Sequence, residues 1–115
     1  MSPMARTRRG RLRQCEAWLK SRYPTPLPVT VRVVDIATDR KCIAETIPGT
    51  RRIIIEIHKH LKWAPAIDCL LHEFGHAVTW RSKDPKHHGP EFAATYGRIY
   101  SDWFDSGGAE ESRTL

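Results

Sequence analysis

The 115-residue chain has room for one domain with a single hydrophobic core. Hydrophobic residues make up 40% of the chain and charged residues 28%, which is typical of a globular protein. No apolar run approaches the ~20 residues of a membrane-spanning helix, and no signal peptide is recognisable at the start. The three cysteines are far apart and form no CxxC pair, which argues against a disulfide scaffold or a cysteine zinc ribbon. We therefore expect a cytoplasmic protein with reduced thiols and no membrane association.

The net charge of +6 is concentrated at the N-terminus. Residues 1–22 hold seven basic side chains and one acidic one, whereas the remaining chain holds twelve of each and is neutral. Such a basic segment can contact phosphates, acidic proteins or a membrane surface, or it can be a solvated tail. The candidate nucleic-acid-binding residues are Arg6, Arg8, Arg9, Arg11 and Arg13.

Small, polar and basic residues at positions 1–10 predict a disordered arm. From position 11 to 23, apolar residues recur at three- and four-residue spacing and predict an amphipathic helix, which is ended by three prolines. The residues of this apolar face are Leu12, Cys15, Leu19 and Tyr23.

Three strands are expected next, at residues 29–35, 42–47 and 51–57, because these segments are rich in β-branched residues. Pro48 and Gly49 suit a tight turn, so the second and third strands are predicted to form an antiparallel hairpin. Ile53, Ile55 and Ile57 lie on one face of the last strand.

A helix is predicted from about residue 65 to 81, then a polar loop, and then a last helix that starts at Gly89-Pro90. The polar residues 108–115 form a tail. The order of helix, three-stranded sheet, helix and helix predicts an α+β fold for one domain spanning residues 11–107.

The first of these two helices contains an HExxH sequence made by His72, Glu73 and His76. Histidines four residues apart on a helix lie one turn apart on the same side, so both imidazoles can reach one metal ion. Glu73 can then accept a proton from a zinc-bound water. The apolar residues of the helix lie roughly opposite the two histidines: Ile67, Leu70, Leu71, Phe74 and Val78. The alternative is a helix with two exposed histidines and no metal.

A catalytic zinc site has three protein ligands and one position open for water. His88 is the best candidate for the third ligand, because the loop after the helix is long enough to return it to the metal; His87 and Glu91 are its rivals. The metzincin spacing is not met, since Thr79 and Ser82 occupy the positions that would need Gly and His. Two earlier histidines, His58 and His60, are interpreted as polar residues that close a strand.

The segments HEFGHA and HHGPEF, with Cys69-Leu70-Leu71 before the first histidine, resemble the SprT-like zinc metallopeptidases of the Spartan/SprT type. The resemblance covers roughly Leu12 to Trp103 and implies a zincin-like minimal domain. It also implies one zinc ion held by His72, His76 and His88, with Glu73 as the catalytic base. The chain resembles a compact form without the cysteine-based zinc module that follows this domain in many relatives.

The leading hypothesis is a monomeric zinc metalloendopeptidase in which Glu73 activates a zinc-bound water to hydrolyse peptide bonds, including those of DNA-associated proteins. The hairpin edge could bind substrate as an added strand, and Tyr96 and Tyr100 are candidates to stabilise the oxyanion. Asp68 could orient a ligand imidazole. The alternative hypothesis is a zinc-stabilised module without proteolytic activity. Such a module would bind nucleic acid or act as a scaffold, with Trp18 and Trp63 as candidates to stack on bases.

Overall fold

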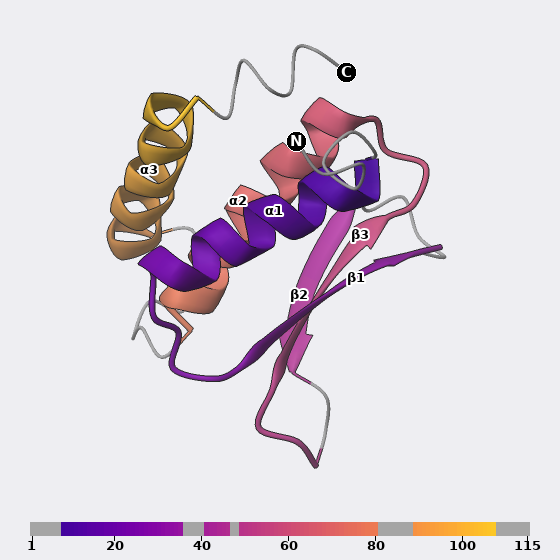
Figure 1. Ribbon diagram of the computed structural model, residues 1–115. Coiled ribbons are helices and arrows are strands. Elements are labelled where there is room, and N and C mark those ends of the chain that lie inside the picture. The colour runs from indigo at the N-terminus through magenta and orange to yellow at the C-terminus, as the bar shows by residue number, and fades with distance from the viewer. Residues whose placement is uncertain (1–7, 36–40, 47–48, 81–88, 108–115) are drawn as a thin grey trace.

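The computed structural model describes residues 8–35, 41–46, 49–80 and 89–107 of the chain. In these residues the fold is α+β, as predicted, with three helices and a three-stranded mixed sheet (Figure 1). The elements in chain order are α1 (Arg8–Arg22), β1 (Val29–Val34), β2 (Cys42–Thr46), β3 (Ile53–His58), α2 (Trp63–Val78) and α3 (Pro90–Asp105).

The sheet has the order β1-β3-β2, so β3 is the central strand. The antiparallel pairing of β2 with β3 confirms the predicted hairpin, and Gly49 has the positive φ of +80° that its turn requires. The parallel pairing of β1 with β3 is a feature that the strand pattern did not predict. Ile53, Ile55 and Ile57 are fully buried on one face, as expected for a strand with partners on both sides.

Helix α1 begins three residues earlier than predicted, so residues 8–10 belong to the helix and not to a disordered arm. Its predicted apolar face is confirmed, because all four of its residues are buried. The same helix also holds four of the five candidate nucleic-acid-binding arginines, and two of these make intramolecular contacts. Arg11 is only 7% exposed and its guanidinium lies 5.8 Å from the ring centroid of Trp63. Arg13 pairs with Glu16 at 2.5 Å and donates a hydrogen bond to the carbonyl of Val31 at 3.1 Å.

Helix α2 begins two residues before the predicted start and ends at Val78 instead of residue 81. Its end has a physical cause, since Thr79 leaves the helical conformation at φ −99° and ψ 20° and its side chain donates to the carbonyl of Gly75. Helix α3 has Gly89 as its N-cap and Pro90 in its first turn, as predicted.

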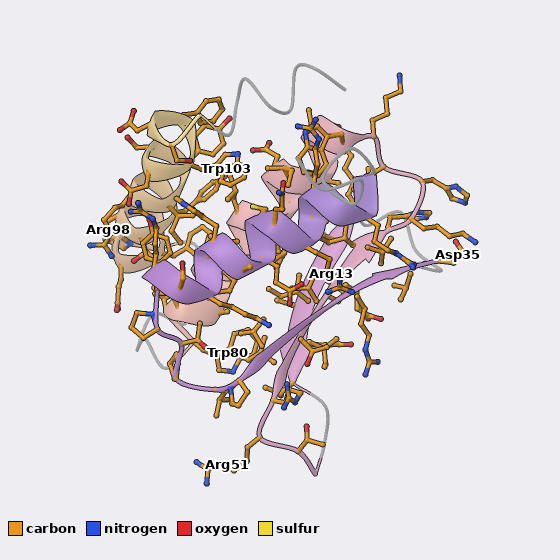
Figure 2. All side chains as sticks on the ribbon, in the orientation of Figure 1. Arg13, Asp35, Arg51, Trp80, Arg98 and Trp103 are labelled. Atoms are coloured by element: carbon orange, nitrogen blue, oxygen red, sulfur yellow. The ribbon has the colours of Figure 1, made fainter. Side chains whose placement is uncertain are left out.

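Helix α2 contacts β2, β3, α1 and α3, and therefore forms the centre of the molecule (Figure 1). On its far side from the sheet, α3 contacts α1 and the residue that follows it. The Trp18 and Trp103 rings meet edge to face at 5.2 Å, and Tyr23, directly after α1, donates a hydrogen bond to Asp102. Trp103 lies on α3, as Figure 2 shows.

No helix in the described part of the chain combines the length and the apolar character that crossing a membrane requires.

Candidate metal centre

His72, Glu73 and His76 come together on α2, which is held in place by its buried face. Leu70, Leu71 and Phe74 are at most 1% exposed and fix the helix against the sheet and its neighbours. The two histidine rings lie on the opposite side, half-buried, with their centroids 4.9 Å apart. One potential ligand atom from each of the three residues lies within 4.8 Å of the others. The helix thus places the side chains of the HExxH sequence close together, as its spacing predicts.

Glu73 is buried, with 7% of its surface exposed. Its Oε1 lies 3.2 Å from Nδ1 of His72 and accepts a hydrogen bond from the thiol of Cys42 at 3.6 Å. The hydrogen bond that His72 donates to the carboxylate of Glu73 raises the pKa of His72 above its usual value. A metal that binds His72 must displace its proton, so metal binding and proton release are coupled at this residue.

Aromatic side chains of α3 pack against the two histidines. Phe92 stacks on His76 with ring centroids 4.1 Å apart and an angle of 16° between the planes. Phe92 and Tyr96 both meet the His72 ring edge to face, at 5.2 and 5.3 Å. The close approach of α3 depends on Gly75, because a Cβ at this position would lie 3.1 Å from Cε2 of Phe92. The aromatic residue after the HHGPE segment and the glycine within HExxH were the sequence signals for this packing.

Two thiols lie next to the carboxylate of Glu73. Cys42, on β2, and Cys69, on α2, also interact with each other, and this interaction raises the pKa of Cys42 and lowers that of Cys69. Both cysteines are free, as is the buried Cys15, which is the state predicted for all three. The contact between Cys42 and Glu73 joins residues 31 positions apart, and no spacing in the sequence indicated it.

A pocket of about 620 Å³ opens beside this centre along α3. Its lining residues are Asp68, Tyr96, Gly97, Tyr100, Ser101, Phe104 and Asp105. Tyr96 connects the pocket with His72, and burial raises the pKa of its hydroxyl to about 12, so this group remains a proton donor at neutral pH. Asp68 and Tyr100 are exposed in the same pocket wall.

The predicted third ligand, His88, and its rival His87 lie outside the described residues. The other rival, Glu91, is exposed in the first turn of α3 and does not belong to the group of donors around His72. The two imidazoles already present suit zinc, which prefers nitrogen and sulfur ligands.

The candidate nucleic-acid-binding residues differ in their exposure and in their intramolecular contacts. Arg9 is exposed, Arg11 and Arg13 make the intramolecular contacts given above, and Arg6 lies outside the described residues. The helix also contains Arg8, whose side chain is not described. Of the two tryptophans considered for base stacking, Trp63 is buried and Trp18 is half-buried beneath the guanidinium of Arg22.

Comparison of the chain with protein-family models, curated proteins and solved structures gives no match. The functional interpretation therefore rests on the chemistry of the centre itself.

Proposed function

We propose that this protein is a zinc-dependent metallopeptidase of the SprT-like type, with a zincin-like domain and one catalytic zinc ion. The observation that carries the proposal is the meeting of His72, His76 and the buried carboxylate of Glu73 on one side of α2, within 4.8 Å of one another. His72 and His76 would hold the zinc, together with His88 from the segment before α3. Zinc bound there would polarise the scissile carbonyl and lower the pKa of a coordinated water.

Glu73 is the proposed general base. Its carboxylate is anchored through Oε1, which contacts His72 and Cys42. A carboxylate offers about four lone-pair positions, so these two contacts leave capacity to accept a proton from the attacking water. The same group then donates that proton to the leaving amine. Burial and the two contacts keep the carboxylate in one orientation, which general-base catalysis requires.

The position of β2 supports binding of the substrate as an extended chain. Within the described sheet β2 is an edge strand, and its first residue, Cys42, contacts the proposed base. A peptide paired with this edge would be held by main-chain hydrogen bonds with its scissile bond close to Glu73. Tyr96, whose hydroxyl keeps its proton at neutral pH, is the proposed donor to the oxyanion. The proposed substrates are proteins or peptides, including proteins bound to DNA that the basic N-terminal segment would contact.

The decisive experiment compares the parent protein with Glu73→Gln in a cleavage assay. Unfolded casein and histone are the substrates, each tested with and without a single-stranded oligonucleotide. We expect cleavage by the parent and a loss of ~10²–10⁴-fold or more in Glu73→Gln, because that variant lacks the base. Glu56→Gln is the matched control, since Glu56 lies on the central strand β3 and alternates there with the buried Ile55 and Ile57, away from the proposed substrate edge, and it should cleave like the parent.

Zinc content should be equal in all three proteins, because neither substitution removes a proposed ligand. Cleavage that persists undiminished in Glu73→Gln would contradict the assignment of the base. A parent that binds the oligonucleotide but cleaves neither substrate would favour a binding module or scaffold.

A further inference from the structure

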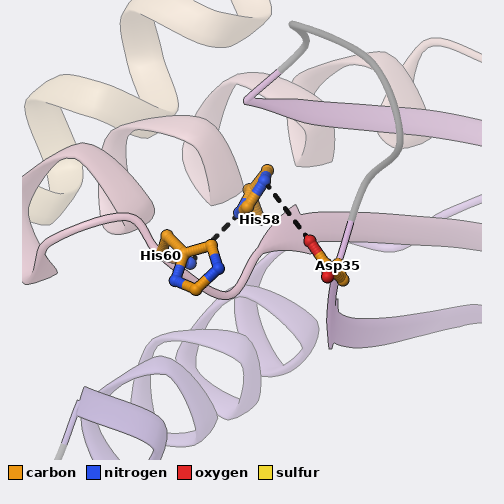
Figure 3. A group of neighbouring side chains, drawn as sticks. All are labelled: Asp35, His58 and His60. Atoms are coloured by element: carbon orange, nitrogen blue, oxygen red, sulfur yellow. Dashed lines mark hydrogen bonds and ion pairs between the residues drawn. The ribbon is translucent and has the colours of Figure 1, made fainter.

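A second cluster of potential metal ligands lies at one end of the sheet, in Asp35, His58 and His60 (Figure 3). One donor atom from each residue lies within 4.8 Å of the other two. Nε2 of His58 is 3.8 Å from Oδ1 of Asp35, and the rings of His58 and His60 are 5.0 Å apart. The sequence pattern indicated only polar residues that close a strand, because nothing in it showed that Asp35 meets them.

The backbone places these three residues together. The parallel register of β1 and β3 pairs Val34 with His58, so Asp35 leaves β1 beside the end of β3. The amide of Lys59 donates to the carbonyl of Val34 at 2.8 Å and fixes this junction. A tight turn follows, in which the amide of Leu61 donates to the carbonyl of His58 at 3.1 Å and returns His60 toward the cluster.

We propose that Asp35, His58 and His60 form a second metal site, for a divalent transition metal that favours imidazole ligands, such as Cu²⁺, Ni²⁺ or Zn²⁺. Two imidazoles and one carboxylate supply three ligands, and water completes the coordination. Two donors bound to one ion at ~2.0–2.2 Å and a tetrahedral angle are ~3.4 Å apart. The observed separation of 3.8 Å between His58 and Asp35 is close to that value. Asp35 and His60 are exposed, so they can adjust to the ion and receive it from solvent.

Two contacts compete with the metal, and both are weak. The backbone amide of His60 donates to Nδ1 of His58 at 3.1 Å. Breaking a hydrogen bond of this kind weakens metal binding by about tenfold. The ammonium of Lys59 lies 3.6 Å from Oδ2 of Asp35, where both groups are largely exposed and their attraction is screened. The free energy of binding a transition metal through three ligands is larger than the free energy of these two contacts.

The proposed site is independent of the centre on α2. His72 lies nine residues into that helix from Trp63, which is about 14 Å along the axis. Asp35 lies on the side of the molecule away from α3 (Figure 2). Neither Asp35 nor the two histidines contributes to the proposed peptidase chemistry, so the two proposals can fail separately.

The test uses Cu²⁺ alone as a probe, added to the metal-free full-length protein while amide signals are followed by NMR. Cu²⁺ binds most tightly in the divalent series and broadens signals near the ion. Broadening at Asp35 and Lys59 reports the proposed second site, and broadening along α2 reports the centre at His72. We expect both regions to respond in the parent.

His60→Ala and Asp35→Asn should each weaken binding at the second site by at least tenfold and leave the response of α2 unchanged. Both replaced side chains are exposed, so the fold should persist, and unchanged spectra elsewhere would verify it. Lys59→Ala is the matched control, since it removes a competitor for Asp35 and should bind as tightly as the parent or more tightly. Equal broadening at Asp35 and Lys59 in the parent and both ligand variants, or none in the parent, would overturn the proposal.

Discussion

Gly75 shows how one missing side chain shapes the candidate metal centre. A methyl group at this position would lie 3.1 Å from the Phe92 ring, which is itself buried and stacked on His76. The ring has little freedom to move aside, so Gly75→Ala should push α3 away from α2. We expect a loss of about 1–3 kcal/mol in the free energy of unfolding, measured with urea, and weaker zinc binding.

Gly97 provides the matched control because it is also helical, but nothing lies within 4 Å of a Cβ built there. Gly97→Ala should stabilise the protein by about 0.4–1 kcal/mol, since alanine favours the helix and restricts the unfolded chain. The two substitutions should therefore have opposite signs. Equal stabilisation by both would show that the close approach of α3 to Gly75 is not a constraint.

The proposed third zinc ligand can be tested by three alanine substitutions, at His87, His88 and Glu91. We expect His88→Ala to weaken zinc binding by more than ~100-fold, which is beyond the effect of losing a residue that only supports a ligand. His87→Ala and Glu91→Ala should change the affinity little. The measurement is competition with a chromophoric chelator. A dominant effect of Glu91→Ala would assign the ligand to α3 and make the site similar to that of the gluzincins.

Among the elements, α3 is joined to the segment directly after α1 by the hydrogen bond from Tyr23 to Asp102. Burial and this bond raise the pKa of Tyr23 from 10.0 to about 12. The folded state thus holds the phenol proton more tightly than the unfolded chain does. Its contribution to stability is complete below pH 10 and is lost as the pH rises through about 12.

Tyr23→Phe should lower the free energy of unfolding at pH 7 by about 1.5–3 kcal/mol, because Asp102 loses its donor. The variant should also lose less stability than the parent between pH 10 and 12. Tyr100→Phe is the control, since Tyr100 is 37% exposed, and its effect should stay within about 0.5 kcal/mol. Urea unfolding across this pH range measures both effects, and identical curves for the two variants would contradict the role given to Tyr23.

At the scale of the whole molecule, two exposed arginines outside α1, Arg51 and Arg98, lie far from each other (Figure 2). Figure 2 shows Arg51 near the turn between β2 and β3, and Arg98 on α3. Since Arg11 and Arg13 make intramolecular contacts, the arginines proposed to bind nucleic acid are Arg6, Arg8 and Arg9. Their joint replacement by glutamine should reduce the log–log salt slope of DNA binding by up to about 2.7 units, at about 0.9 per phosphate.

Replacement of Arg51 and Arg98 by glutamine is the control for charge, because both side chains are exposed, one just before β3 and the other on α3. This control should leave the salt slope nearly unchanged. Fluorescence anisotropy with a duplex oligonucleotide at several salt concentrations gives the slopes. If the parent and the N-terminal variant have the same slope, the arginines at the start of the chain do not contact phosphate.

The sequence by itself determined those features that depend on neighbours along the chain. Helical periodicity placed His72 and His76 on one side of α2 and its apolar residues on the other, since a helix fixes the positions of residues four apart. The β2–β3 hairpin was also predictable, because its strands follow each other in the sequence and Gly49 between them takes a positive φ. Helix ends were less well predicted, and Arg8 and Val78 each differ from the expected limit by three residues.

Only the tertiary structure decided which distant residues meet. The contact of Cys42 with Glu73, the stacking of Phe92 on His76, and the meeting of Asp35 with His58 all join different elements. Local propensity does not specify these contacts, because they depend on how the elements pack and on the parallel register of β1 with β3. The surroundings of the proposed base, and the second cluster of ligands, are therefore consequences of packing.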